Sequence, residues 1–165
     1  MVMAVLIVTP NRYSYFSNIR TGGEDMVLRK ISCGVAGGAV GALVDSFNIW
    51  ILGKLGVTTL IGIALQPKFT ASWLYPRLIW GGIWGLLFIV PILEKRTVLR
   101  GMVLSIAPSA MVLFVVFPGM GRGMFGLGFG TLTPVLVIFL NFIWGIVAAF
   151  WYQNSADKKK PMVYF

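Results

Sequence analysis

The sequence predicts an all-α protein, a polytopic transmembrane bundle of four helices with a short interfacial or re-entrant helix after the first span. Three observations carry this prediction. The 165-residue chain is 58% hydrophobic and 12% charged, whereas soluble domains carry about 25% charged residues. Four apolar runs approach or exceed the roughly 20 residues that a helix needs to cross a bilayer. Small and polar residues recur along one face of each run, as in closely packed membrane helices.

Residues 1–30 form a predicted cytoplasmic or interfacial leader. Its apolar start, from Met1 to Thr9, is too short to span a membrane and lacks the basic region of a signal peptide. A second candidate start is the segment Met26-Val-Leu-Arg-Lys, which stands directly before the first long apolar run. Both Met1 and Met26 therefore stay open as the start, and we expect a chain that begins at Met26 to insert normally.

The four spans together form a predicted transmembrane domain over residues 31–153. In chain order they cover residues 31–52, 76–93, 98–117 and 132–151. Residues 57–66 are apolar but too short to cross, which favours an interfacial or re-entrant helix. Pro76 suits the first turn of the second span, where its missing N–H is harmless. Pro108 predicts a kink in the third span.

Basic residues gather at the ends of the spans and predict the orientation of the chain. Ten Lys and Arg residues fall in the leader, the 94–100 link and the tail, residues 154–165. The other side carries four: Lys54, Lys68, Arg77 and Arg122. The positive-inside rule then places both termini in the cytoplasm. We interpret the net charge of +9 as topology and contact with anionic lipids, not as nucleic-acid binding.

Asp45 is the only acidic residue inside a long apolar run. It shares a helix face with glycines and with Asn48, so we expect it to face a neighbouring helix instead of lipid. The glycines expected to allow close helix packing are Gly34, Gly38, Gly41, Gly81, Gly85 and Gly145. The residues expected to form a buried polar cluster are Asp45, Asn48, Arg77, Ser109 and Asn141.

Two alternatives to this cluster stay open. Arg77 can instead extend its guanidinium to the outer interface, as long basic side chains near helix ends often do. Asp45 can instead bind neighbours on its own helix and a water molecule. A double substitution of Asp45 and Arg77 separates a true pair from either alternative.

Several chemistries are disfavoured by the residue types present. The chain has no histidine and one cysteine, Cys33, so we predict no metal site, no disulfide and no histidine-ligated cofactor. A bound lipid, or a pigment with other ligands, stays compatible with the sequence. The formal G-x-G-x-x-G from Gly121 to Gly126 lacks a surrounding βαβ unit, and we interpret it as a tight link with Arg122 at lipid head groups. The tryptophans in mid-span, Trp80, Trp84 and Trp144, fill gaps or face lipid, or else contact a cofactor or another subunit.

Four segments resemble a group of small, uncharacterised four-span bacterial membrane proteins. They are Leu74-Tyr-Pro-Arg-Leu-Ile-Trp-Gly-Gly-Ile-Trp-Gly, Ala107-Pro-Ser, Phe117-Pro-Gly and Asn141-Phe-Ile-Trp-Gly. The resemblance covers residues 26–153 and implies four spans in the inner membrane of a bacterium, but no activity, because the group has none established.

The leading hypothesis for function is a non-catalytic accessory or assembly subunit that packs against other membrane chains through its glycine faces and tryptophans. The alternative is a small oligomeric transporter or channel that uses the Asp45–Arg77 pair. Four spans rarely enclose a route alone, so this alternative requires self-association. We do not expect an enzyme, because one carboxylate cannot supply both acid and base chemistry.

Overall fold

The computed structural model describes residues 12–156, with side chains from Gly23 onward. The described chain is all-helical and contains no strand. Within residues 12–156, three helical segments are long and apolar enough to cross a membrane: Gly23–Lys54, Thr97–Gly119 and Thr133–Ala156. The all-helical membrane class is therefore confirmed at the level of three candidate spans. Leader residues 1–11 and tail residues 157–165 lie outside the described residues.

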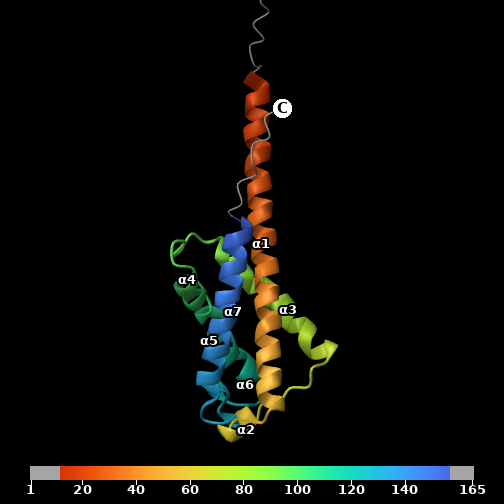
Figure 1. Cartoon of the computed structure of the whole chain (residues 1–165), viewed down its shortest axis with the longest axis vertical. Coiled ribbons are helices and arrows are strands. Elements are labelled where there is room, and N and C mark those ends of the chain that lie inside the picture. Colours follow the sequence, from red (N-terminus) through yellow and green to blue (C-terminus); the bar gives the residue numbers. More distant parts are fainter. Residues whose placement is uncertain (1–11, 157–165) are drawn as a thin grey trace, which may run out of the picture.

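The elements alternate long helices with short helical turns (Figure 1). In chain order they are α1 (Arg12–Lys54), α2 (Val57–Leu60), α3 (Ala71–Gly85), η1 (Leu86–Ile89), α4 (Thr97–Leu104), α5 (Ile106–Met111), η2 (Val112–Val116), α6 (Phe117–Gly119), η3 (Met124–Phe129) and α7 (Thr133–Ala156). Of the turns, η1 and η3 are 3-10 helices and η2 is a π-helix.

The helix α1 is much longer than the predicted first span. Its 43 residues extend roughly 65 Å, about twice the thickness of the hydrocarbon core. The helix runs without a break from Arg12 through the predicted leader into the first predicted span, so the two are joined in one helix and no turn separates them. The early part of α1 projects beyond the bundle (Figure 1). The helix ends at Lys54, and Gly56 follows in the left-handed conformation with φ of 74°.

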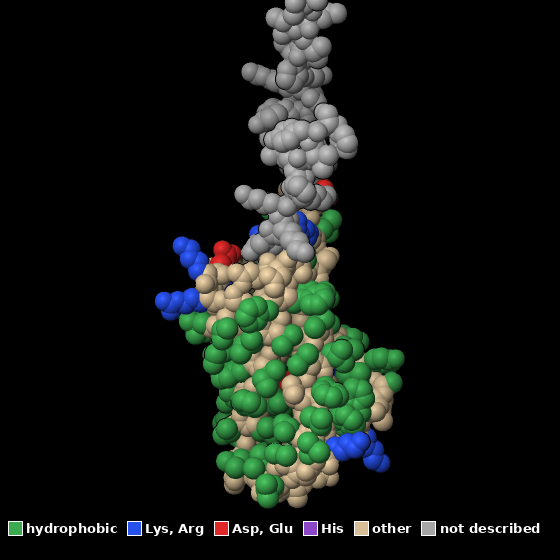
Figure 2. Space-filling model, in the orientation of Figure 1, with side chains coloured by type: hydrophobic (Ala, Val, Ile, Leu, Met, Phe, Trp, Pro, Cys, Tyr) green, Lys and Arg blue, Asp and Glu red, His purple; other side chains and the backbone are tan. Residues whose placement is uncertain are grey.

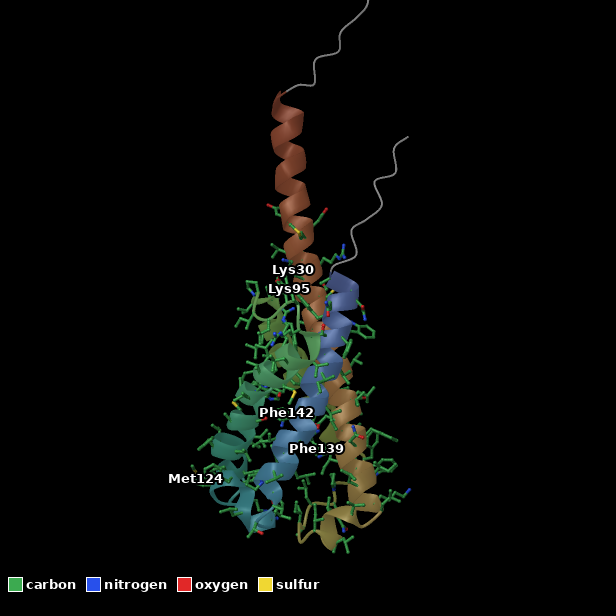
Figure 3. All side chains as sticks on the ribbon, turned by 60° about the vertical axis from the view of Figure 1, so that its left-hand side comes forward. Lys30, Lys95, Met124, Phe139 and Phe142 are labelled. Carbon is green, nitrogen blue, oxygen red and sulfur yellow. The ribbon has the colours of Figure 1, made fainter. Side chains whose placement is uncertain are left out.

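Two hydrogen-bonded groups define the ends of the bundle. At one end, which we call the basic end, Arg29 donates to the carbonyl of Ser155, and Thr97 donates to Gln153. Lys30 and Lys95 both lie toward this end (Figure 3). At the other, the loop end, the N–H of Ala64 donates to the carbonyl of Phe129 at 2.7 Å. The loop after α1 and the glycine-rich link before α7 therefore pack together.

Glycines bring the helices into backbone contact near the basic end. A Cβ atom on Gly34 would lie 2.8 Å from the carbonyl oxygen of Gly85 in α3, and one on Gly101 would lie 2.5 Å from that of Gly145 in α7. A Cβ on Gly38 would overlap the backbone of Gly81 in α3. Real side chains do not approach backbone so closely, so these sites accept only glycine.

The second predicted span differs at both ends from the helix that forms. The helix α3 begins at Ala71, so Pro76 lies inside it and not in its first turn. Proline there removes one backbone hydrogen bond, and the ring contacts from Trp73 to Phe69 and from Phe69 to Trp50 hold this end of the helix against α1. Helical structure ends at Ile89, before residue 93, because Val90 precedes Pro91 and is extended.

The third and fourth predicted spans, residues 98–117 and 132–151, correspond to the observed helical segments Thr97–Gly119 and Thr133–Ala156. The third helix is interrupted at Ser105 and by the π-turn η2, around Pro108, which cannot donate to the carbonyl one turn earlier. The predicted helix at 57–66 is reduced to the four residues of α2. The rest of that segment is turn and coil, with the side chain of Ile63 fully buried at the loop end.

Hydrophobic side chains cover the flank of the bundle, and charged side chains gather toward its ends (Figure 2). Inside, the buried apolar residues form two clusters. The first lies toward the basic end and consists of Ala42, Phe88, Leu104, Trp144, Ala148, Ala149 and Tyr152. The second lies toward the loop end and consists of Ile63, Leu113, Phe117, Phe129 and Val137. A charge-poor flank between charged ends is the distribution that a bilayer requires.

A candidate ligand cavity with a buried ion pair

Asp45 and Arg77 form an ion pair between α1 and α3. Nη2 of Arg77 lies 2.6 Å from Oδ2 of Asp45, and Nε donates to the hydroxyl of Ser46 at 2.8 Å. The guanidinium also lies over the ring of Trp73, 4.8 Å from its centroid. Arg77 thus binds across to α1 and does not simply extend to the interface. Such pairs hold two helices in one register when one partner is buried.

The two partners differ in their access to solvent or ligand. The side chain of Asp45 is 13% exposed, whereas that of Arg77 is 36% exposed. The second carboxylate oxygen, Oδ1, is buried and has no hydrogen-bond partner in the described part of the chain. The carboxylate is therefore the enclosed side of the pair, and the guanidinium is the accessible side.

The pair lines a cavity of about 510 Å³ between α1, α3, α5, η2 and α7. Its walls are mainly aromatic and apolar, with four tryptophans among them: Trp73, Trp80, Trp84 and Trp144. Asn141 adds an amide from α7. A largely apolar cavity of this size with a few convergent polar groups has the general character of a small-molecule site.

The structure brings together some of the predicted cluster and not the rest. Asp45, Arg77 and Asn141 line the same cavity, although the amide of Asn141 donates to Val137 on its own helix at 3.0 Å. Ser109 donates to the carbonyl of Ser105, also on its own helix, at 2.8 Å. Neither Ser109 nor Asn48 lines the cavity. The sequence places each polar residue on a face of its own helix but does not show which faces meet, so it could not separate the three residues that line the cavity from the two that do not.

Sequence reasoning missed Ser46, which is fully buried and accepts from Arg77. A hydroxyl beside Asp45 is a weak signal, because serines are common in membrane helices. It also treated Arg100 as a topology signal. Arg100 is instead 5% exposed, and its Nη2 donates to the carbonyls of Phe88 and Val90 at 2.6 and 2.9 Å. These carbonyls are left without helical partners where η1 ends before Pro91.

The predicted glycine face of α1 also divides between two neighbours. Gly34 and Gly38 contact α3, but Gly41 contacts Trp144 of α7. The indole of Trp144 is 3% exposed and donates to the carbonyl of Gly38 at 2.9 Å. Of the interpretations open for the mid-span tryptophans, Trp144 fills the interior, whereas Trp80 is 50% exposed at the cavity.

Other motifs contribute no further site. Arg122, in the glycine-rich link, lies over the ring of Phe129 at 4.6 Å. Among the described residues, no group of three His, Cys, Asp or Glu side chains is placed to hold a metal ion. The chain matches no protein-family model, and no curated protein or solved structure matches it.

Proposed function

We propose that this protein is a non-catalytic membrane protein that binds a small molecule in the cavity around Asp45 and Arg77, as the binding chain of an oligomeric carrier. One observation carries the proposal. The ion pair stands at the wall of a cavity of about 510 Å³ and is not enclosed in a packed interface. Ionisable residues inside membrane helices are costly, and they commonly mark the path or site of a ligand.

The packing of the glycines supports this hypothesis over an accessory subunit. An accessory role was expected to use the glycine faces to bind other chains. In the structure, Gly34, Gly38, Gly81 and Gly85 join α1 to α3, and Gly145 faces Gly101. These close-packing faces are occupied within the chain, so they do not offer a partner helix a free surface.

We further propose that α3 and η1 form a fourth crossing. Hydrogen bonds place Arg29, Thr97 and Ser155 at the basic end, while Ala64 and Phe129 pair at the loop end. The chain leaves α1 at the loop end and reaches Thr97 at the basic end. The segment between them must therefore return across the bundle, which supports four spans in an up-down order.

The same arrangement supports our proposal that both termini are cytoplasmic in a bacterial inner membrane. The basic end carries Lys30, Lys95 and Arg96, and the positive-inside rule assigns such an end to the cytoplasm. Reporter fusions after Gly128 and after Ala156 test it. We expect an external report from the first and a cytoplasmic report from the second. A cytoplasmic report after Gly128 contradicts the four-span arrangement.

The surroundings of the pair support our proposal of a non-catalytic role. Ser46 is fully buried and already bonded to Arg77, and among the described residues no second acidic side chain lines the cavity. One carboxylate bound to a guanidinium lacks the separate acid and base that general catalysis uses. The pair is better suited to orienting a bound group than to transferring a proton.

The test of binding is the mass of the protein extracted in mild detergent with its native ligand. We expect the wild-type protein to retain a small-molecule adduct and to self-associate. Val116→Trp, which places a large ring at the cavity wall, should lose the adduct. Val115→Trp is the matched control, because Val115 is 57% exposed and does not line the cavity. Equal adducts in both variants would contradict the proposal.

One observation favours the accessory role as a second candidate. Before Arg29 reaches α7, the helix α1 exposes Met26, Val27 and Leu28 by 55% or more. This part projects from the bundle (Figure 1) and offers an apolar surface to another chain. Co-purification of a stoichiometric partner that is lost when residues 1–25 are removed and Val27 is changed to Lys would favour this role.

A further inference from the structure

The charged group that a ligand can reach in the cavity is a hydrogen-bond donor. The guanidinium of Arg77 is 36% exposed, and no described residue accepts a hydrogen bond from its Nη1. The free acceptor of the pair, Oδ1 of Asp45, is buried out of reach. The amide oxygen of Asn141 is the remaining acceptor of note, beside a mainly apolar wall. This balance suits a ligand that presents an acceptor, such as a carboxylate, a phosphate or an ester carbonyl.

The apolar part of the cavity is continuous with the flank of the bundle. Trp80, Val116 and Met120 line the cavity and are also 50%, 38% and 60% exposed. Trp80 belongs to α3, which packs on α1, while Val116 and Met120 belong to the third helix and the link after it. The cavity thus opens to the surface of the bundle between α3 and η2, beside exposed apolar side chains.

The ion pair also limits the charge that the head group of the ligand can carry. A cationic head group would have to displace Arg77 from Asp45, because the other carboxylate oxygen is enclosed. An acceptor head group binds to the outer edge of Arg77 and leaves the pair intact. Asp45 then serves as the positioning residue that holds the guanidinium toward the cavity.

We propose that the cavity binds an amphiphile taken laterally from the bilayer, with an anionic acceptor head group on Arg77 and its hydrocarbon chain beside Trp80 and Met120. The inference rests on the proposed function and specifies its ligand class. It differs from uptake of a small polar solute, which would enter from the aqueous ends. A free inorganic anion shares the head-group chemistry, so the experiment must separate the two sources.

The experiment uses the full chain in lipid nanodiscs and three diazirine probes of equal chain length: a fatty acid, the matching alcohol and the matching amine. After illumination, peptide mass spectrometry maps the labelled residues. We expect the acid to label peptides of both α3 and η2, more than the alcohol or the amine. Unlabelled fatty acid should suppress this labelling, and millimolar inorganic phosphate should not.

Two pairs of variants, each with a matched control, test the head-group contact and the opening of the cavity separately. Arg77→Gln should lower labelling by the acid about tenfold, the loss expected for one charge-assisted hydrogen bond, while Arg122→Gln should not. Met120→Trp narrows the opening without touching the ion pair and should lower labelling at an unchanged unfolding temperature. Met124→Trp is its control, because Met124 is exposed, lies near the loop end (Figure 3) and does not line the cavity.

Each other result overturns the inference in a defined way. Stronger labelling by the amine assigns the site to cations, and suppression by phosphate assigns it to a free anion. Equal labelling of Met120→Trp and Met124→Trp rejects access from the bilayer. If the native adduct disappears in Val116→Trp but the fatty acid does not bind, the ligand class is wrong and the proposed function stands. If neither an adduct nor labelling is found, both fail.

Discussion

The two halves of the bundle are built in opposite ways. Toward the basic end, Gly34 meets Gly85 and Gly101 meets Gly145, so the helices touch through their backbones. Toward the loop end, the helix α3 carries Trp73, Arg77 and Trp80 in place of glycines, and a cavity of about 510 Å³ lies beside them. The helix α3 therefore belongs to both halves. Its glycines pack directly against α1, whereas its large side chains line the cavity.

This difference shows how a short chain can contain a cavity and still fold. Close backbone contact gives the packing contacts that replace the hydrophobic effect inside a membrane. Because this packing stabilises the half toward the basic end (the closed half), the half toward the loop end (the open half) can contain a cavity and the protein still folds. The ion pair joins α1 to α3 at the point where glycine contact ends, which keeps the open half in register. We expect substitutions in the closed half to affect stability, and those in the open half to affect binding more.

The largest effect is expected from Gly38→Leu. A leucine side chain cannot fit against the backbone of Gly81, so α1 and α3 must separate. We expect a loss of at least about 3 kcal/mol of stability, at the upper end of overpacking effects, measured as the unfolding temperature in detergent. Gly119→Leu is the control, because nothing lies within 4 Å of the Cβ it would add. Wild-type stability in Gly38→Leu would mean that this face of α1 looks at lipid.

The ion pair should give an asymmetric pair of losses. Arg77→Gln leaves the enclosed carboxylate of Asp45 unpaired, for which about 3–5 kcal/mol is typical. Asp45→Asn should cost less, because the released guanidinium is already 36% exposed and can reach the interface. The double variant should lose less stability than the sum of the two single losses, with the free energy of unfolding of each variant measured by chemical denaturation. Strictly additive losses would show that the two residues act independently.

Arg100 tests the closed half without changing its glycines. Arg100→Gln removes charged hydrogen bonds to the carbonyls of Phe88 and Val90, and we expect a loss of about 2 kcal/mol. The exposed neighbour Arg96 provides the control substitution, Arg96→Gln. Thermal unfolding compares the two. If they behave alike, the carbonyls at the end of η1 find other donors.

The smallest effect is expected at the basic end of α7. Arg29 donates to the carbonyls of Ser155 and Ala156, which a helix leaves unpaired at its C-terminus. Arg29→Gln should cost about 1 kcal/mol and should raise hydrogen exchange in the last turn of α7. Lys30→Gln is the matched control. If hydrogen exchange instead rose in the helices around the cavity, the contact of Arg29 with α7 would also stabilise the half that contains the cavity.

The sequence alone determined the class of the protein. Apolar runs of spanning length and a low charge content predict helices that cross a bilayer, and three helices of the described chain are long and apolar enough to do so. Glycine spacing identified close-packing positions, and the isolated Asp45 identified a polar interior, because both depend on residue type and helical period alone. Boundaries were less accurate. Pro76 was expected in the first turn of its helix, but aromatic contacts extend α3 back to Ala71.

Only the tertiary structure decided which faces meet. The glycine stripe of α1 reads as one surface, yet Gly38 contacts α3 and Gly41 contacts Trp144 of α7. Ser109 and Asn141 were both expected in the polar cluster, yet Asn141 lines the cavity and Ser109 does not. Arg100 reads as a charge at the membrane surface, yet it turns inward to the carbonyls left free at the end of η1. The helical period sets the direction of a side chain around its own axis, whereas its partners depend on how the helices rotate and tilt against one another.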